Sequence, residues 1–377
     1  MRSTVQSRWW ALLVWIGLFH IIDLEPKSKM NDNFYKLLIC PVDKNSLIQK
    51  DSYLVCESNH KYPIVNGVPV ILLGDACPTL WVSRKSWEVA NNFIERSDLV
   101  EPYFIETLGL SNEERTALKE ITINKPYPRG LEAIVTSLLG AACGNLYKGI
   151  KCDLTRLPIP TLPLSKNSGL LLDIGCNWGR WSIAASRHGF NVVGLDPSLG
   201  AVIVAKEICQ YLGINANFVC ADSRYLPFCS EKFDVVFSYS VLQHFSKEDV
   251  ATSLKEIHRV LQQGGLSLIQ MANIFGIRSL YHQLKRNFRK PVDFDVRYWK
   301  PDELTHTFNL NVGSSKVYAD CFLGLGIQYD NNTQLLYPAK RFVAVYSKIL
   351  KTLERRIPSL SFLADSLYVE SIKRKSH

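Results

Sequence analysis

The sequence predicts an α/β protein in which a parallel sheet flanked by helices is preceded by a smaller β-rich module. Strand-like and helix-like segments alternate from residue 169 onward, a glycine-rich turn follows the first of these strands, and short apolar runs between turn residues fill residues 34–74. The chain has 377 residues, of which 47% are hydrophobic and 21% are charged. This composition is that of a globular protein, and it excludes collagen-like, low-complexity and wholly disordered chains.

Four zones follow one another along the chain. Residues 1–30 are an apolar leader, residues 34–74 form the β-rich module, and residues 75–168 have a helical pattern that ends in a Pro-rich linker. Residues 169–377 carry the parallel α/β pattern together with a C-terminal part that we expect to cover the substrate. Since the chain has one long apolar run, a polytopic membrane protein is excluded.

The elements of the last zone can be placed in order. Buried strands are predicted over 170–174, 192–195, 218–220, 233–237, 266–271, 316–321 and 367–372. Helices are predicted over 180–187 and 199–212, and a third begins at Ser246, where Ser-Lys-Glu-Asp resembles a capping box. Gly264 and Gly265 are predicted to end this third helix.

The first strand leads into the turn Asp173-Ile174-Gly175-Cys176-Asn177-Trp178-Gly179, and the second strand ends in Asp196. Glycines allow a ligand to approach the backbone, and an acid at the end of strand two can accept hydrogen bonds from ribose hydroxyls. The spacing differs from the dinucleotide fingerprint, and Asp173 would repel a pyrophosphate but suit a cationic ligand with an ammonium group. Asp222, after the third strand, can accept from an adenine amine.

The segments LLLDIGCNWGRWSIAASRHGFNVVGLDPS, ADSRYLPF and FDVVFSYSVLQHF together resemble class I S-adenosylmethionine-dependent methyltransferases, in particular those of quinone biosynthesis. The resemblance implies a Rossmann-like seven-stranded sheet whose antiparallel strand, residues 367–372, lies beside the fifth strand. It also implies S-adenosylmethionine as the cofactor. The cofactor-binding residues that it implies are Asp173, Gly175, Asn177, Gly179, Asp196, Asp222, Ser223 and Ser238. Asn177 stands where the family usually has Gly, and Asn tolerates a positive φ.

His244, in the loop after strand four, is the one obvious base near this site, so we predict it as the catalytic residue. A surface or packing histidine is the alternative. Tyr239, Ser240 and Gln243 are candidates for lining the methyl-transfer face. Asn145 and Tyr147, upstream of the sheet, are candidates for a lid over the cofactor.

The β-rich module contains two turn-like knuckles, Cys40-x₂-Asp43 and Cys56-x₃-His60. Their spacing is that of a zinc ribbon, with Asp43 where Cys is expected. Residues 34–72 resemble the zinc-ribbon activator family of tRNA methyltransferases. Two interpretations stay open: a zinc ion held by Cys40, Asp43, Cys56 and His60, or a metal-free ribbon held together by its apolar strands.

Residues 9–22 form an unbroken apolar run behind Arg2 and Arg8. The run is an interfacial or short membrane anchor, an export signal, or the product of a mis-assigned start codon. Ten cysteines in 377 residues are too few for a disulfide scaffold. We therefore predict a cytoplasmic protein, in weak contact with the inner face of the membrane if residues 9–22 are an anchor.

Positive charge is concentrated at the C-terminal end. The net charge is +9, and residues 340–377 contain nine Lys or Arg against three acids. A basic cluster between 276 and 300 either covers the substrate or is a solvated loop. Residues 341–356 have apolar residues at helical spacing, which fits a helix packed on the protein or one that lies on a membrane.

These observations together predict transfer of a methyl group from S-adenosylmethionine to a small-molecule, lipid-linked or sugar acceptor. RNA methylation, with nucleic acid as the partner, is the first alternative. A non-catalytic adaptor that keeps the methyltransferase fold is the second alternative, which the three acids disfavour.

Overall fold

The computed structural model describes residues 32–74, 81–95, 103–125, 127–142, 147, 153–324 and 338–374. Residues 36–377 form one compact unit, and the short helix α2 (Asp32–Tyr35) belongs to a separate N-terminal unit. The predicted leader, with its apolar run 9–22, and the lid candidate Asn145 lie outside the described residues. Within the described ranges no helix is both long enough and apolar enough to cross a bilayer.

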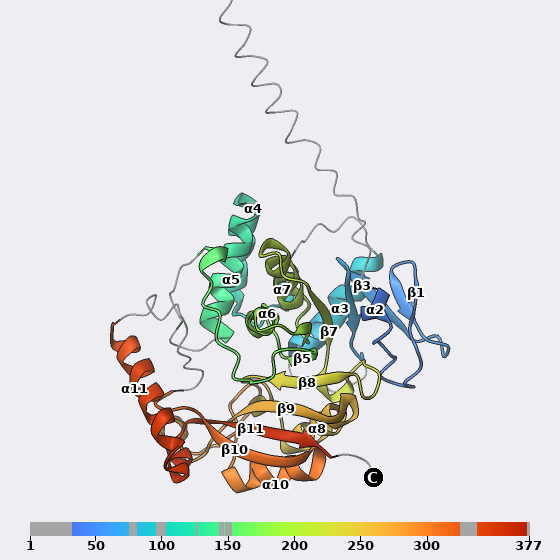
Figure 1. Ribbon diagram of the computed structural model, residues 1–377. Helices are drawn as coiled ribbons and strands as arrows, with labels where there is room; N and C mark the ends of the chain where they lie inside the picture. Colours follow the sequence, from blue (N-terminus) through green and yellow to red (C-terminus); the bar gives the residue numbers. More distant parts are fainter. Residues whose placement is uncertain are drawn as a thin grey trace, which may run out of the picture. The chain divides into compact units, whose positions relative to one another are not determined.

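An eleven-stranded sheet forms the centre of residues 36–377, in the order β1-β2-β3-β4-β7-β6-β5-β8-β9-β11-β10 (Figure 1). The strands span Ile48–Lys50 (β1), Tyr53–Val55 (β2), Lys61–Val65 (β3), Val68–Ile71 (β4), Leu170–Ile174 (β5), Asn191–Asp196 (β6), Ala216–Ala221 (β7), Phe233–Ser238 (β8), Leu261–Ala272 (β9), Gly313–Cys321 (β10) and Ser366–Lys373 (β11).

The predicted count of seven strands is therefore wrong for the sheet as a whole. Strands β5 to β11 are the seven that residues 169–377 contribute in the described ranges, and the β-rich module adds β1 to β4 at one edge. The junction is a parallel pairing of β4 with β7, in which Val70 faces Cys220 and Ile71 faces Ala221. This pairing satisfies backbone groups of β7 that would otherwise form an open sheet edge.

At the opposite edge, β11 lies between β9 and β10 and is antiparallel to both. This confirms the predicted antiparallel strand beside the fifth strand. The fifth strand itself differs from expectation, because β9 begins at Leu261 and contains Gly264 and Gly265. Leu261 pairs with Phe233, and the register then shifts before Val235, so the two glycines lie in an irregular stretch of the strand.

The helices span Trp81–Glu95 (α3), Asn112–Asn124 (α4), Arg129–Ala142 (α5), Arg180–Arg187 (α6), Leu199–Tyr211 (α7), Lys247–Val260 (α8), Ile277–Lys285 (α9), Pro301–Asn311 (α10) and Pro338–Glu354 (α11). Short 3₁₀ turns include η1 (Ile105–Thr107), η3 (Ser223–Tyr225), η4 (Leu242–His244) and η6 (Pro358–Leu363). As predicted, Ser246 caps α8, and its hydroxyl accepts a hydrogen bond from the backbone N–H of Asp249 at 3.0 Å.

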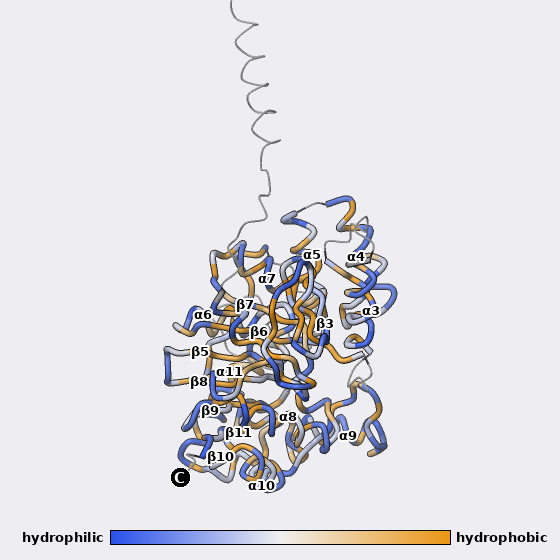
Figure 2. Tube along the Cα trace, turned by 90° about the vertical axis from the view of Figure 1, so that its right-hand side faces the viewer, coloured by the Kyte–Doolittle hydropathy of each residue, from blue (hydrophilic) through white to orange (hydrophobic). Residues whose placement is uncertain are grey.

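The predicted helical zone packs onto the sheet domain. Helices α3 and α5 contact α7, and α8 and α10 pack against each other and against β9 and β10 respectively. One apolar cluster joins Leu131 and Ile134 of α5 to Trp178, in the glycine turn, and to Val202 of α7. Figure 2 shows the most hydrophobic positions concentrated along the central strands, where both faces of the sheet are covered.

Candidate active site

The residues predicted to bind the cofactor lie at the carboxyl ends of four parallel strands, β5 to β8. In the sheet order, β5 has β6 on one side and β8 on the other, so the chain reverses its direction of progress at β5. In open α/β sheets the crevice at such a switch point is where ligands bind. The turn from β5 to α6 and the loops after β6, β7 and β8 all reach this edge.

The glycine turn has the backbone conformation that its sequence predicts. Gly175, Asn177 and Gly179 have φ values of +75°, +47° and +87°, so the expectation that Asn177 adopts a positive φ is confirmed. The backbone N–H of Gly175 donates to Leu195 O at 2.7 Å, which ties the turn to β6. A Cβ atom at Gly175 would lie 2.1 Å from Cγ2 of Val241, so the loop after β8 closes against the turn at this glycine.

Asp173 and Asp196 are both buried at the ends of their strands. The Ser182 hydroxyl donates to Asp173 Oδ2 at 2.6 Å. Asp196 accepts backbone hydrogen bonds from Asn177 N at 3.0 Å and from Ser198 N at 2.9 Å, one on each carboxylate oxygen. Loss of hydration raises the pKa of Asp173 to about 7, with a further contribution from the charge of Asp196, and it raises the pKa of Asp196 to about 6.

Asp222 follows β7 and forms an ion pair with an arginine that was not predicted from the sequence. Arg224 forms a buried ion pair with Asp222, with Nη2 2.8 Å from Oδ2, and its Nη1 atom lies 2.9 Å from Asp249. The Asp222 carboxylate also accepts from the backbone N–H of Arg224. The neighbouring Ser223 hydroxyl pairs with Ser253 of α8 at 3.0 Å, so it is directed to the packing of that helix.

The residues at the end of β8 form hydrogen bonds either to the start of the glycine turn or to strands β9 and β10. The hydroxyl of Ser238 donates to Ile174 O at 2.9 Å and so links β8 to the start of the turn. Tyr239 donates to Asp320 of β10 at 2.7 Å, and the backbone and hydroxyl of Ser240 both donate to Gln270 of β9. These contacts fix the strand end beside the glycine turn.

His244 lies in η4, and the loop around Phe294 holds its ring. The imidazole stacks on Phe294 with ring centroids 3.8 Å apart, and Nδ1 is 2.7 Å from Phe294 O. A carbonyl oxygen can only accept, so we assign the proton to Nδ1, which makes Nε2 the unprotonated nitrogen of the neutral ring. Burial lowers the pKa of His244 to about 4, so the ring is neutral at physiological pH.

The helical zone contacts the site through polar groups that the sequence reading missed. At the start of α7, the backbone N–H of Leu199 donates to Ser86 Oγ at 3.0 Å and that of Gly200 donates to Thr107 Oγ1 at 2.7 Å. Tyr147, predicted as a lid residue, is buried, and its hydroxyl accepts from Arg180 of α6 at 2.9 Å. The hydroxyl residues carried no local signal, because their partners lie about 90 or more positions away in the sequence.

A basic cavity of about 440 Å³ adjoins the loop that carries His244. It is lined by Ser246, Lys247, Gln283, Arg286, Phe288, Arg289, Lys290, Pro291, Arg297, Tyr298 and Trp299. Five of these residues are cationic. Two buried donors, Nε of Arg286 and Nε1 of Trp299, have no hydrogen-bond partner among the described residues. Such a lining favours a ligand with an anionic or hydrogen-bond-accepting group.

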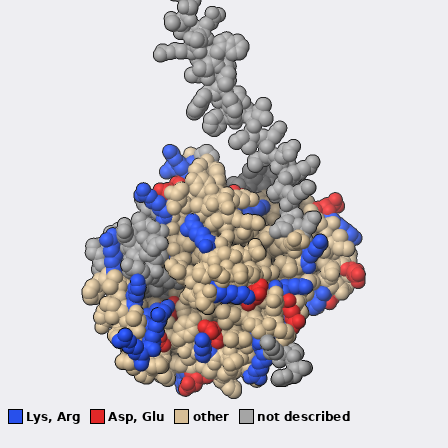
Figure 3. All heavy atoms as spheres, viewed as in Figure 1, with Lys and Arg blue, Asp and Glu red and all other residues tan. Residues whose placement is uncertain are grey.

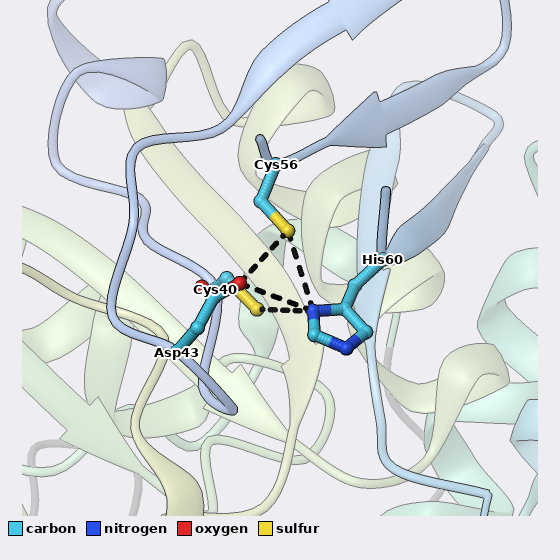
Figure 4. A group of neighbouring side chains, drawn as sticks. All are labelled: Cys40, Asp43, Cys56 and His60. Atoms are coloured by element: carbon cyan, nitrogen blue, oxygen red, sulfur yellow. Dashed lines mark hydrogen bonds and ion pairs between the residues drawn. The ribbon is translucent and has the colours of Figure 1, made fainter. Parts of the chain in front are cut away.

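In the β-rich module the structure brings the four predicted metal ligands together (Figure 4). The ligand atoms of Cys40, Asp43, Cys56 and His60 all lie within 4.8 Å of one another. His60 Nδ1 is 3.5 Å from Cys40 Sγ and 3.3 Å from Cys56 Sγ, and Asp43 Oδ2 is 3.2 Å from both His60 Nδ1 and Cys56 Sγ.

These separations are close to those in a zinc site. Tetrahedral zinc with ordinary bond lengths to S, N and O places its ligand atoms about 3.3–3.8 Å apart. The carboxylate of Asp43 is also fixed by a hydrogen bond from the backbone N–H of Asn45 at 3.0 Å, and Tyr62 OH lies 3.1 Å from Cys40 Sγ. The donor set of two thiols, one imidazole and one carboxylate therefore fits zinc in type and in spacing.

Comparison with known proteins identifies the domain that contains the glycine turn. Residues 171–265 match the family model described as a methyltransferase domain. The ubiquinone biosynthesis O-methyltransferase of Azorhizobium caulinodans is 29% identical over 103 residues, which cover 27% of this chain and 40% of that protein. An uncharacterized protein of Methanocaldococcus jannaschii is 33% identical over 127 residues, which cover 33% of this chain and 46% of that protein.

Among solved structures, the YcgJ protein of Bacillus subtilis is 20% identical to this chain, with a TM-score of 0.38, and the match covers 56% of this chain and 94% of that one. The chain spans less than half the length of the two curated relatives. The family model covers residues 171–265, from β5 into β9, so this region is similar to a methyltransferase domain.

Proposed function

We propose that this chain is an S-adenosylmethionine-dependent methyltransferase that transfers a methyl group to a small-molecule, lipid-linked or sugar acceptor. The observation that carries the proposal is the set of acids at the ends of three successive parallel strands, Asp173, Asp196 and Asp222, within the matched methyltransferase domain. The names of the ubiquinone biosynthesis relatives support an acceptor that is not a macromolecule.

The carboxylates fit the cofactor in chemical type and in the number of hydrogen bonds that they can still accept. Asp196 uses one lone pair of each oxygen on backbone N–H groups, so each oxygen keeps one lone pair for the two vicinal ribose hydroxyls. Asp173 offers a buried negative charge to the ammonium group of the cofactor. When bound, S-adenosylmethionine supplies an electrophilic methyl group, and the chain's task is to orient the acceptor toward it.

His244 is proposed to act on the acceptor. Its neutral ring is oriented by Phe294, and Nε2 can take a proton from an attacking hydroxyl as the new bond forms. The basic cavity begins two residues later, at Ser246. Its cations would hold an anionic group of the acceptor, such as a carboxylate or phosphate.

Two alternatives remain. RNA methylation is favoured by the same cations, since phosphate groups would also suit the cavity. A non-catalytic adaptor would explain the engagement of Asp222 by Arg224, but it gives no reason for Asp173 to be buried at the crevice.

Binding of the cofactor is the first test. Isothermal titration calorimetry of the full chain with S-adenosylmethionine should detect one site, and Asp196→Ala should weaken it roughly 10- to 150-fold, the effect of losing charge-assisted hydrogen bonds. The matched control is Asp234→Ala, at the amino end of β8, whereas the crevice lies at the carboxyl ends of the strands. Absence of binding by the unaltered chain would refute the proposal.

The acceptor class requires a second experiment. Mass spectrometry of small molecules, lipids and RNA nucleosides should be compared between cells with and without the gene. Loss of a methylated small molecule or lipid supports the proposal, whereas loss of a methylated nucleoside supports the RNA alternative. If neither class of molecule changes, and the Asp196→Ala variant still rescues a growth defect of cells that lack the gene, the adaptor alternative is the better account.

We also propose that Cys40, Asp43, Cys56 and His60 hold one zinc ion in a zinc-ribbon module. Their mutual distances support this, as does the hydrogen bond that orients Asp43. Elemental analysis of the full chain produced with ample zinc should find one zinc per chain, and Cys56→Ser should lose it. If the unaltered chain holds no zinc, the module is a metal-free ribbon held by its apolar strands.

A cytoplasmic location with weak membrane contact through residues 9–22 remains part of the proposal. Fractionation of cells that express the full chain tests it, because an anchored chain would sediment with membranes even in high salt. A chain found entirely in the supernatant would favour the mis-assigned start codon.

A further inference from the structure

Helix α11 has its apolar side exposed and a small or polar side buried. Its exposed apolar residues, 42–70% accessible, are Phe342, Val345, Tyr346, Ile349 and Leu353. They recur at the spacing of one helical face. The buried residues are Ala344, Ser347 and Glu354, and Val343 packs partly buried beside Cys321. An ordinary surface helix has the reverse arrangement, because burial of its apolar stripe is what holds it in place.

Helix α9 repeats this arrangement. Ile277, Leu280, Tyr281 and Leu284 are exposed, whereas Ser279 and Gln283 are buried. The polar side is attached by hydrogen bonds: Ser279 N donates to Asp365 Oδ1 at 2.9 Å, and Gln283 Nε2 donates to Ile274 O at 3.1 Å. The helix is thus held by polar contacts while its apolar side faces outward.

Turn η6 connects the exposed apolar sides of the two helices. Turn η6 follows α11 and packs against it, and its Phe362 and Leu363 are exposed. The ring of Phe362 lies 6.3 Å from that of Phe275, just before α9, and Phe362 O accepts from Asn273 Nδ2 at 2.9 Å. We call the exposed apolar residues of α9, η6 and α11 the apolar surface. Exposed apolar side chains that gather on neighbouring elements mark interaction sites, whereas singly scattered ones do not.

The segments that form the apolar surface are strongly basic. Residues 275–292 contain five Lys or Arg and no acid, and residues 338–363 contain six Lys or Arg and one acid. That acid, Glu354, is buried. Figure 3 shows Lys and Arg side chains gathered at the lower left of the molecule, where α11 lies in Figure 1.

We propose that the apolar surface docks on an anionic lipid bilayer. Apolar side chains flanked by Lys and Arg are the composition of helices that lie in the membrane interface, and anionic headgroups attract such cations. A second copy of the chain suits the surface poorly, because a symmetric contact would bring the same cations face to face. Nucleic acid suits the surface poorly as well, because its phosphate backbone offers no apolar group to pack against these side chains.

Docking in this way would bring the basic cavity close to the headgroups. Arg286 and Phe288 follow α9 directly and line that cavity. This consequence rests on the proposed function only where it concerns a lipid-linked acceptor. The docking itself requires no methyl transfer, so the docking proposal and the proposed function can be refuted separately.

Vesicle sedimentation of the full chain tests the apolar part. We expect binding to phosphatidylcholine vesicles that contain phosphatidylglycerol, and much weaker binding to phosphatidylcholine alone. The double variant Phe342→Glu, Ile349→Glu should bind at least about tenfold more weakly, since it places two acids in the interface. The matched control is Ile123→Glu, Leu310→Glu, at positions that are 81% and 76% exposed on α4 and α10.

A second pair of variants tests the charges. Lys285→Gln with Arg355→Gln should weaken binding to the anionic vesicles roughly thirtyfold, the value for two cations near a charged surface. Lys50→Gln with Lys61→Gln makes the same change in net charge in the β-rich module and should have no effect. Thermal melting of each variant verifies that it is folded.

Two results would overturn the proposal. If the Phe342→Glu, Ile349→Glu variant binds vesicles as well as the unaltered chain, another segment, such as residues 9–22, carries any membrane binding. If the unaltered chain is a dimer that this variant converts to a monomer, and vesicles do not bind, the apolar surface is an interface between copies.

Discussion

Cofactor affinity should depend steeply on pH, because the two carboxyls at the crevice become protonated in the free protein as the pH falls from about 8 to about 5. Burial raises the pKa of Asp173 to about 7 and that of Asp196 to about 6. If the cofactor binds only when both are ionised, its apparent dissociation constant rises as the ionised fraction falls. Affinity should then be about 20-fold weaker at pH 6 than at pH 8, and about 1000-fold weaker at pH 5.

The stability of the free protein should change in the opposite direction. An acid whose pKa is higher in the folded than in the unfolded chain stabilises the fold when protonated, and that contribution is lost as pH rises through the folded value. For Asp196 the loss is about 2 kcal/mol between pH 4 and pH 7. The free protein therefore becomes less stable as its affinity for the cofactor increases, and cofactor binding should offset this loss.

Calorimetry with S-adenosylhomocysteine from pH 5 to pH 8.5 measures the affinity profile, and thermal melting of the free chain measures the stability profile. Asp196→Asn should remove one of the two titrations, so the remaining change should centre on Asp173. Asp234→Asn changes a carboxyl whose pKa is lowered and should leave the profile as it is. An affinity that does not vary with pH, or an unaltered profile in Asp196→Asn, would refute the assignment of these carboxyls to the cofactor.

Three further outcomes are expected. Asp43→Cys should raise zinc affinity in a chelator competition, because thiolate is the softer ligand, whereas Cys229→Ser, outside the cluster, should not change it. Nitrogen NMR should find the His244 ring neutral with its proton on Nδ1 down to about pH 5, and a ring that titrates near 6.5 would contradict the hydrogen-bond assignment. Gly175→Ala should destabilise the chain more than Gly213→Ala, because both sites have a positive φ, which costs about 1–2 kcal/mol, but only the first also places a Cβ against another side chain.

Much of the parallel sheet could be predicted because its signals are local. The apolar runs of β5, β6 and β8, the glycine turn and the Ser246 cap each depend on neighbours in the sequence. The attachment of β4 to β7 could not be predicted in this way. Its partners, Val70 and Cys220, are 150 positions apart, and short strands of this kind carry no mark of their neighbour.

The positions of the site's acids could be predicted, but the side chains that pair with them could be predicted less well. The acids were found from the strand ends where they lie. Arg224 was not, because a basic residue two positions after Asp222 has many other uses on a surface. Periodicity likewise predicts that residues 341–356 form an amphipathic helix, but it cannot say which side faces the protein. The structure shows that the side with Ala344, Ser347 and Glu354 does.

The proposed metal cluster should influence the cofactor site through the backbone that joins them. Beside the Cys40 knuckle, Leu38 bridges Phe228 and Ile39 N donates to Pro227 O at 3.0 Å, while β4 pairs with β7, which ends immediately before Asp222. The β-rich module therefore contacts the segment 216–229 at two places, at Cys220–Ala221 and at Pro227–Phe228.

Removal of zinc by a chelator should loosen this segment selectively, since the ligands that fix the knuckle would no longer be held together. Hydrogen exchange followed by mass spectrometry should detect faster exchange in 216–229 of the metal-free chain, with β10 and β11 at the far edge of the sheet as the internal reference. The metal-free variant Cys56→Ser should show the same pattern without chelator. Equal exchange in 216–229 with and without metal would mean that β4 and the Leu38 bridge hold the segment unaided, and that the module and the cofactor site are independent.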